Sequence, residues 1–165
     1  MKFFKNMALA TIAVGFSCSA FAQSVDEKEG WHFQQFEKAV GSLYYGAKEN
    51  DELLTIAFIC DQQAETVDVL LREAGSGLKP DARMCVFAAT GDQESDLCGK
   101  TIPNELAGIP DFEAIVSRRL PLFRPVEDEA ANMTLSIRGT EQKIPLEGFN
   151  AAYQSFANVC YGVGG

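Results

Sequence analysis

The chain contains a single histidine, His32, and a single tryptophan, Trp31. A catalytic triad or a Cys–His pair would have to use His32, yet no serine or cysteine lies in a recognisable nucleophile context. No Cys-x-x-Cys motif is present, which argues against disulfide-exchange chemistry and against a cysteine-bound zinc ion. We therefore expect no enzymatic activity, no metal and no cofactor. We expect His32 to be a surface or half-buried neighbour of Trp31.

Basic residues are scarce: the 165 residues include 14 Lys and Arg against 23 Asp and Glu, and the net charge is −9. Proteins that bind nucleic acid or anionic membranes need clustered Lys and Arg to displace counterions. This balance argues against both kinds of partner. It permits a basic protein partner, although many exported proteins are acidic for solubility alone.

The chain lacks a long apolar run outside its first 22 residues. Lys2 and Lys5 precede an apolar run over residues 7–16 that is too short to span a bilayer, and Ala20-Phe21-Ala22 fits the small-x-small cleavage rule. We predict a bacterial signal peptide over residues 1–22. The mature protein is then periplasmic or secreted, with no transmembrane segment.

Cys18 raises the alternative of a lipoprotein, but the preceding Gly15-Phe16-Ser17 does not match the context of a lipid-attachment cysteine. Removal of the leader leaves 143 of the 165 residues, enough for a single domain over residues 23–165. Because the leader carries two lysines and no acid, its removal changes the net charge from −9 to −11.

Four cysteines remain in the mature chain, and an even number in an exported protein indicates two disulfides. Four cysteines allow three pairings. We favour Cys85 with Cys98, which flank a local hairpin, and Cys60 with Cys160, which would link a C-terminal helix to a central strand. Loop-closure entropy predicts about 4 to 5 kcal/mol of stabilisation from the longer bridge and about 3 kcal/mol from the shorter.

The region from Asn132 to Gly162 has the clearest pattern. Apolar and polar residues alternate over 133–137 and again at 144–146, around the turn 138–141, which predicts a hairpin. A helix should follow directly, with Gly162 as its C-cap. Its apolar stripe has helical spacing and consists of Phe149, Ala152, Tyr153, Phe156 and Cys160.

Further strands are predicted over residues 53–60, 66–72, 83–90 and 97–102, with an acidic turn over 91–96. The first of these is apolar on both faces, as expected of a central strand. Residues 31–47 are mixed, because Phe33, Phe36 and Val40 have helical spacing whereas 42–45 would suit a short strand.

A short internal helix is predicted after Pro110 and Asp111, with Pro121 as its stop. Its apolar stripe would be Phe112, Ile115, Val116 and Leu120. Together these elements predict an α+β domain whose sheet is mainly antiparallel, as a sandwich or partial barrel. The C-terminal helix would be linked to that sheet by a disulfide.

Asp92, Glu94 and Asp96 have the spacing with which a calcium-binding loop begins. The turn glycine is replaced by Leu97 and the closing acid by Pro103, so we expect a solvated hairpin tip.

A second acidic run, Glu127-Asp128-Glu129, is expected to be a solvated loop that could steer association with a basic surface. A possible interaction surface combines aromatic residues with the first acidic run: Trp31, Tyr44, Tyr45, Asp92, Glu94 and Asp96. Core packing is the alternative use of each aromatic side chain.

The strand over 53–60, the late stripe at 112–120 and the turn 144–149 into a cysteine-bearing helix form a pattern over about half of the mature chain. This pattern resembles two groups of small exported bacterial proteins, the invasion-associated locus B family and the VasI-type accessory proteins of type VI secretion. The resemblance implies a periplasmic or secreted β-rich domain without known enzymatic machinery. It carries no catalytic motif and assigns no functional residue.

These observations favour an exported, non-enzymatic binding protein that acts by protein contact, such as an accessory, inhibitor or immunity-type factor. An alternative is a carrier of a small apolar molecule or glycan, with a pocket lined by Phe33, Phe36, Phe58 and Phe87. A hydrolase that uses Asp92 and Glu94 ranks last, because exposed acids on a turn lack the burial that shifts a catalytic pKa.

Overall fold

The computed structural model describes residues 29–47, 54–129 and 131–162, which form nine strands and one helix. The predicted signal peptide, its cleavage site and Cys18 lie outside the described residues. The elements, in chain order, are β1 (Gly30–Glu37), β2 (Val40–Gly46), β3 (Ile56–Asp61), β4 (Thr66–Leu71), β5 (Arg83–Thr90), β6 (Gln93–Ile102), β7 (Asp111–Ser117), β8 (Asn132–Ile137), β9 (Thr140–Pro145) and α1 (Phe149–Tyr161).

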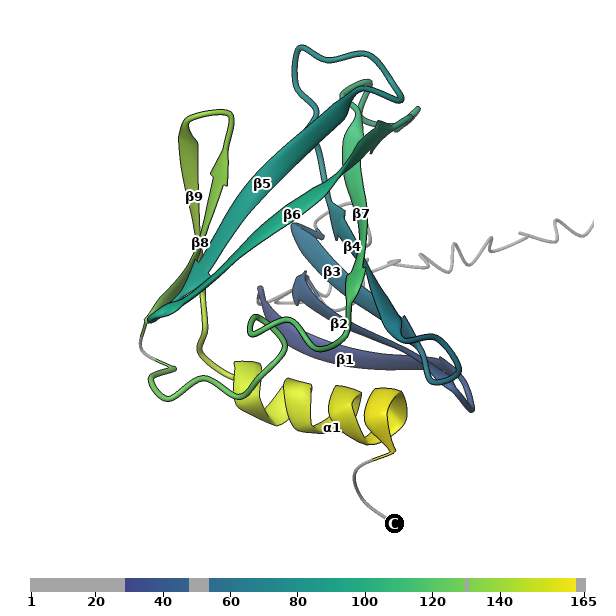
Figure 1. Cartoon of the computed structure of the whole chain (residues 1–165), viewed down its shortest axis with the longest axis vertical. Helices are drawn as coiled ribbons and strands as arrows, with labels where there is room; N and C mark the ends of the chain where they lie inside the picture. The colour runs from purple at the N-terminus through teal and green to yellow at the C-terminus, as the bar shows by residue number, and fades with distance from the viewer. Residues whose placement is uncertain (1–28, 48–53, 130, 163–165) are drawn as a thin grey trace, which may run out of the picture.

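All nine strands belong to one sheet in the order β1-β2-β3-β4-β7-β6-β5-β8-β9. Every neighbouring pair is antiparallel. The sheet curls into a half-barrel, and α1 covers its open end beside β1 and β2 (Figure 1). The mainly antiparallel sheet and the C-terminal helix are therefore confirmed.

The C-terminal helix has the predicted bounds and buries the predicted stripe of five residues, from Phe149 to Cys160. Gly162 adopts the left-handed conformation at its C-cap, with φ of 66°. The preceding hairpin turns at Arg138 and Gly139, which both have positive φ, so β9 already begins at Thr140.

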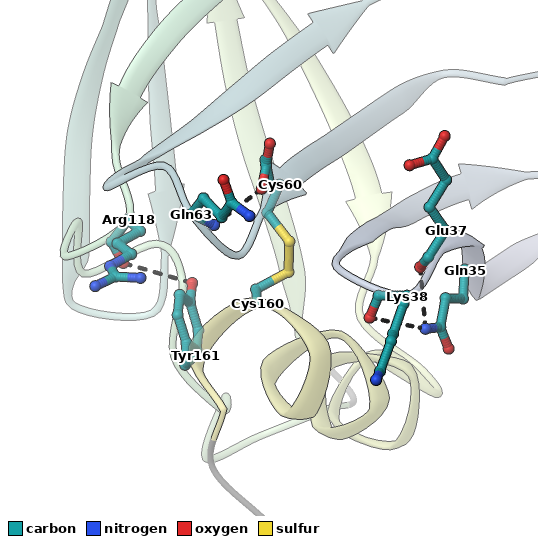
Figure 2. The surroundings of a disulfide bond; sticks show 9 residues. Gln35, Glu37, Lys38, Cys60, Gln63, Arg118, Cys160 and Tyr161 are labelled. Atoms are coloured by element: carbon teal, nitrogen blue, oxygen red, sulfur yellow. Dashed lines mark hydrogen bonds between the residues drawn. A yellow bond between two sulfur atoms is a disulfide. The ribbon is translucent and has the colours of Figure 1, made fainter.

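A disulfide joins Cys60 at the end of β3 to Cys160 in the last turn of α1, as Figure 2 shows. Both cysteines are buried, with 3% and 1% of their surface exposed. The second disulfide joins Cys85 to Cys98. The structure thus has the pairing that the sequence favoured, and the first bridge attaches the helix to the sheet.

The core lies between the concave face of the sheet and α1. Phe58 of β3 is fully buried at its centre. Its ring is stacked on Trp31 at a centroid distance of 6.2 Å and meets Phe123 edge-on at 5.2 Å. Phe149 contacts Trp31 edge-on at 4.8 Å, so one aromatic cluster connects the sheet, the helix and the loop before β8.

The predicted internal helix is wrong: residues 111–117 form strand β7, which lies between β4 and β6 near the middle of the sheet. Phe112, Ala114 and Val116 are buried in alternation with the exposed Ile115 and Ser117. Over so short a segment, an alternation of period two and a helical stripe fit the same apolar residues. Residues 111–117 form a strand because β4 pairs with them on one side and β6 on the other.

Two further boundaries differ from the sequence prediction. The helical spacing over residues 33–40 does not produce a helix, because the segment is divided between the paired strands β1 and β2. Strand β6 begins at Gln93 instead of residue 97, so the acidic turn is shorter than predicted. Glu94 and Asp96 therefore belong to a strand and not to a turn.

Strand β6 pairs with β7 only from Lys100 to Ile102, at one end of its length. Gly99 stands where the pairing stops, and a Cβ there would overlap the carbonyl oxygen of Glu113 in β7. A glycine is required because the two backbones cross at close range. Beyond this point β6 diverges from β7, which opens the sheet into its half-barrel shape (Figure 1).

Among the residues that the structure describes, no helix is long and apolar enough to cross a membrane.

Candidate binding site

The aromatic part of the predicted interaction surface lies mostly in the interior. Trp31 and Tyr44 are only 7% and 8% exposed, so the prediction that they form part of a surface is corrected. Trp31 points inward on β1 beneath α1, where a large apolar side chain fills the core. Tyr45 is half-buried, and burial together with the Glu29 carboxylate raises the pKa of its hydroxyl.

His32 is half-buried, as predicted, and its ring lies 5.4 Å from that of Tyr44. Its Nε2 atom is buried and has no hydrogen-bond partner within the described part of the chain. Its pairing partner in the neighbouring strand β2 is Tyr44.

The four phenylalanines that were expected to line a pocket are divided between the core and the surface. Phe58 is fully buried and Phe33 packs against the core, whereas Phe36 of β1 and Phe87 of β5 are 56% and 37% exposed. Strands β1 and β5 are not neighbours in the sheet. These four rings therefore do not converge on one cavity.

The first acidic run is also divided. Asp92 lies in the β5–β6 turn, whereas Glu94 and Asp96 are exposed residues on the outer face of β6. Along the described ranges of the chain, no three His, Cys, Asp or Glu side chains converge in a way that could hold a metal ion. Asp92 lies in the turn before the strand, and Glu94 and Asp96 follow one another along the extended β6, so the three carboxylates do not surround one point as they would in a calcium loop.

Asp92 instead lines one cavity together with two residues of the second acidic run. A cavity of about 380 Å³ lies between the β5–β6 turn and the loop that precedes β8. Figure 1 shows this turn beside that loop, at the lower left. The lining residues are Thr90, Gly91, Asp92, Gln93, Pro125, Val126, Glu127, Asp128, Ala131 and Leu146. We call this cavity the acidic pocket, because its three titratable residues are all acids.

Thr90 adds a second polar feature to the acidic pocket. It ends β5 and points to the concave side of the sheet, with 8% of its surface exposed. Its hydroxyl is buried and has no hydrogen-bond partner within the residues that the structure describes. A buried hydroxyl without a partner costs free energy, and it is the kind of group that a donor entering the pocket could satisfy.

The loop that carries Glu127 and Asp128 is held against α1 by specific hydrogen bonds. The Asn150 side chain accepts a hydrogen bond from the Val126 amide and donates one to the Val126 carbonyl, both at 2.8 Å. Glu129 accepts a hydrogen bond of 2.7 Å from the Asn150 amide in the first turn of the helix. These bonds set the position of the pocket wall before any ligand arrives.

Glu129 has a structural role that the sequence did not indicate. The first turn of α1 contains no acidic residue, and Gly148 at the N-cap has no side chain to accept a bond. The Glu129 carboxylate accepts from a free amide at the positive end of the helix, in place of a local cap. The acidic loop is therefore an ordered part of the fold, and only Glu127 and Asp128 of its three acids line the pocket.

A side-chain hydroxyl from the middle of α1 also holds this loop, at a residue nearer the start of the loop. Tyr153 donates a buried hydrogen bond of 2.8 Å to the Phe123 carbonyl. Burial raises the pKa of Tyr153, while the positive charge of Arg124 acts in the opposite direction.

The acidic pocket thus combines carboxylates from segments about 35 positions apart with the buried hydroxyl of Thr90, which has no hydrogen-bond partner among the residues that the structure describes. Such a set of oxygen acceptors suits a cationic hydrogen-bond donor, such as an ammonium or guanidinium group. Both acidic runs are visible in the sequence, but the sequence did not predict that they line one cavity. Comparison of the chain with protein-family models, with curated proteins and with solved structures gives no match.

Proposed function

We propose that this chain is an exported, non-enzymatic binding protein, periplasmic or secreted, that acts by protein contact and receives a basic side chain of its partner in the acidic pocket. The observation that carries the proposal is the meeting of Asp92 with Glu127 and Asp128 around Thr90. A binding factor of the accessory, inhibitor or immunity type fits this arrangement. The net charge of −9 favours the same kind of partner.

The pocket suits a single inserted side chain better than a flat charged contact. A lysine or arginine that enters a cavity of about 380 Å³ exchanges water for carboxylate oxygens on two walls. Its hydrogen-bond donors could also reach Thr90, whose hydroxyl lacks a partner among the described residues. All three acids are exposed in the free protein, and a cation that several of them contact at once is positioned more specifically than a cation with one acceptor.

The disulfides and the ordered loop support this role because they reduce the entropy lost on binding. Asn150 and Glu129 hold the loop wall against α1, and Cys60–Cys160 holds α1 against β3. A wall that is already positioned in the free protein does not need to be ordered by the partner.

The experiment is affinity capture of the oxidised mature chain, residues 23–165, from envelope and secreted fractions at low and high salt, with mass spectrometry of the retained proteins. Three chains are compared: the wild type, a pocket variant with Asp92→Asn and Glu127→Gln, and a control with Glu94→Gln and Asp96→Asn. Both variants lose two negative charges, so they separate a specific pocket from net charge.

We expect one stoichiometric basic protein that the wild type and the control retain at low salt and that the pocket variant loses. Retention of that protein by all three chains would place the contact elsewhere. Equal loss from both variants would indicate attraction by net charge alone. Recovery of no protein would contradict the proposed function.

A further inference from the structure

The two disulfides differ sharply in their access to solvent. Cys85 and Cys98 lie directly opposite each other in the antiparallel pair β5–β6, and both are exposed on the outer face of the sheet. Cys60 and Cys160 are almost fully buried between β3 and α1. A thiolate must reach a sulfur atom to open a disulfide, so only the first bridge is open to attack from outside in the folded protein.

The surroundings of the exposed bridge leave room for an attacking group. An open depression of about 540 Å³ is lined by both cysteines and by Asp81, Arg83, Met84, Gly99 and Lys100. Cys60 and Cys160, by contrast, are buried where the last turn of α1 meets β3 (Figure 2).

Two positive charges stand beside the bridge. Arg83 and Lys100 are paired in register, two residues from the cysteines and on the same face of the sheet. A nearby cation stabilises a thiolate, both as a leaving group and as the product of reduction. Asp81 opposes this effect in part, since its carboxylate lies 3.3 Å from the Lys100 ammonium. Asp96 is also on this face, opposite Phe87.

We propose that Cys85–Cys98 is a redox modification site, opened by an external thiol or dithiol while Cys60–Cys160 stays intact. An incoming thiolate attacks one sulfur of the bridge and forms a mixed disulfide, and the other cysteine leaves as a thiolate. A second thiol then attacks the mixed disulfide and releases the first cysteine. The bridge gains two electrons, the thiol donor is oxidised to a disulfide, and its two protons reside on Cys85 and Cys98.

The fold predicts that this reduction is local and reversible. Strands β5 and β6 remain paired over eight residues from Arg83 to Thr90, and each has another strand on its far side. The two thiols therefore remain opposite each other after reduction and can form the bond again. The modification therefore takes place on the surface of the folded protein and does not require unfolding of the domain.

The experiment exposes the oxidised mature chain to reduced glutathione in one arm and to reduced thioredoxin, a protein dithiol, in the other. Samples are quenched with acid, alkylated and mapped by mass spectrometry. We expect Cys85 and Cys98 to be labelled at least about tenfold faster than Cys60 and Cys160. Faster opening in one arm identifies the class of thiol, and selective labelling in either arm supports the proposal. Simultaneous labelling of all four cysteines, or no labelling in both arms, would overturn it.

Variants test the part played by the charges. Arg83→Gln with Lys100→Gln should slow the opening about threefold, because the leaving thiolate loses its neighbouring cations. Lys143→Gln with Arg119→Gln removes the same charge from exposed positions on other segments and should leave the rate unchanged. Equal rates in the two variants would contradict assistance by Arg83 and Lys100. A Cys85→Ser and Cys98→Ser chain should remain unlabelled under the same conditions, which confirms that Cys60–Cys160 is protected.

Discussion

The indole Nε1–H of Trp31 donates a hydrogen bond of 2.6 Å to the carbonyl oxygen of Pro145. Trp31 belongs to β1 and Pro145 ends β9, which are the two outermost strands of the nine-stranded sheet. A residue in one edge strand thus bonds to the opposite edge, 114 positions along the chain. The contact draws the ends of the half-barrel together over the aromatic core.

Replacement of Trp31 with phenylalanine tests this closure. The smaller ring leaves a gap beside Phe58 and Phe149, and the Pro145 carbonyl loses its donor. We expect the free energy of unfolding to fall by about 2 to 3 kcal/mol. Urea denaturation followed by circular dichroism measures it, with Phe36→Leu at an exposed position as the control. A Trp31→Phe chain as stable as that control would show that the contact adds nothing.

The two disulfides should contribute unequally to stability. Cys60–Cys160 closes a loop with a sequence separation of 100, and Cys85–Cys98 closes one of 13. Replacing each pair with serine should lower the free energy of unfolding by about 4 to 5 kcal/mol for the first pair and about 3 kcal/mol for the second. Serine at the buried pair adds the cost of two polar groups in the core. Equal midpoints of denaturation for the two double variants would refute the ranking.

Asp111 should be far more important than its place in the sequence suggests. The residue is 2% exposed, and its carboxylate accepts hydrogen bonds from Arg72 at 2.9 Å, from the Glu73 amide at 2.8 Å and from Asn104 at 2.9 Å. Asp111→Ala removes the acceptor of these three hydrogen bonds and the carboxylate beside the partly buried guanidinium of Arg72. We expect a loss of about 3 kcal/mol.

The matched control for this prediction is Asp81→Asn, because the φ of 63° at this position would strain an alanine but suits an asparagine. Asp81 also forms an ion pair, with Lys100 at 3.3 Å, but its side chain is 80% exposed. Solvent screens such a pair, so its removal should change the free energy of unfolding by less than about 1 kcal/mol. Thermal denaturation of both variants gives the comparison, and similar losses from the two would contradict the buried network as the source of stability.

The protein should lose stability in alkaline solution. Burial raises the pKa of both Tyr153 and Tyr161 above the ordinary value near 10. The folded state therefore holds these phenolic protons more tightly than the unfolded state. Their contribution is complete below about pH 10 and is lost as the pH rises through the folded pKa values.

Denaturation midpoints measured between about pH 9 and pH 11.5 test this dependence. Tyr153→Phe should start lower, because it loses the hydrogen bond to Phe123, but should fall less steeply above about pH 10. A variant that retains the full slope would show that Tyr153 does not contribute to it.

The C-terminal part of the fold was readable because its signals are local. A stripe from Phe149 to Cys160 with helical spacing, a glycine at 162 and an Arg138-Gly139 turn each specify a conformation within a few residues. The long-range bond between Cys60 and Cys160 was also accessible, since few other partners remained for four cysteines.

Strand β7 shows where local signals fail. Phe112, Ile115 and Val116 share a face of a helix, and Phe112, Ala114 and Val116 share a face of a strand. Two neighbouring strands with free backbone groups decided between these possibilities, and both lie far away in the sequence. Asp111 changed its role with the element, from a presumed helix-end charge to the centre of a buried network.

The acidic pocket could not be predicted from the sequence for a related reason. Asp92 was expected to act with Glu94 and Asp96, its sequence neighbours, but Asp92 lies in the β5–β6 turn and the other two acids lie along the outer face of strand β6. The partners of Asp92 are Glu127 and Asp128, and their position depends on the bonds that Asn150 and Glu129 make to the loop.

The sequence by itself therefore determined the amphipathic C-terminal helix, its hairpin, several strands and the acidic charge, because hydrophobic period and turn chemistry act over short distances. Only the tertiary structure decided that residues 111–117 are a strand, that Trp31 bonds to Pro145 and that two acidic runs enclose one pocket. Each of these depends on which distant segments become neighbours when one sheet curls around one core, and neither periodicity nor composition encodes that choice locally.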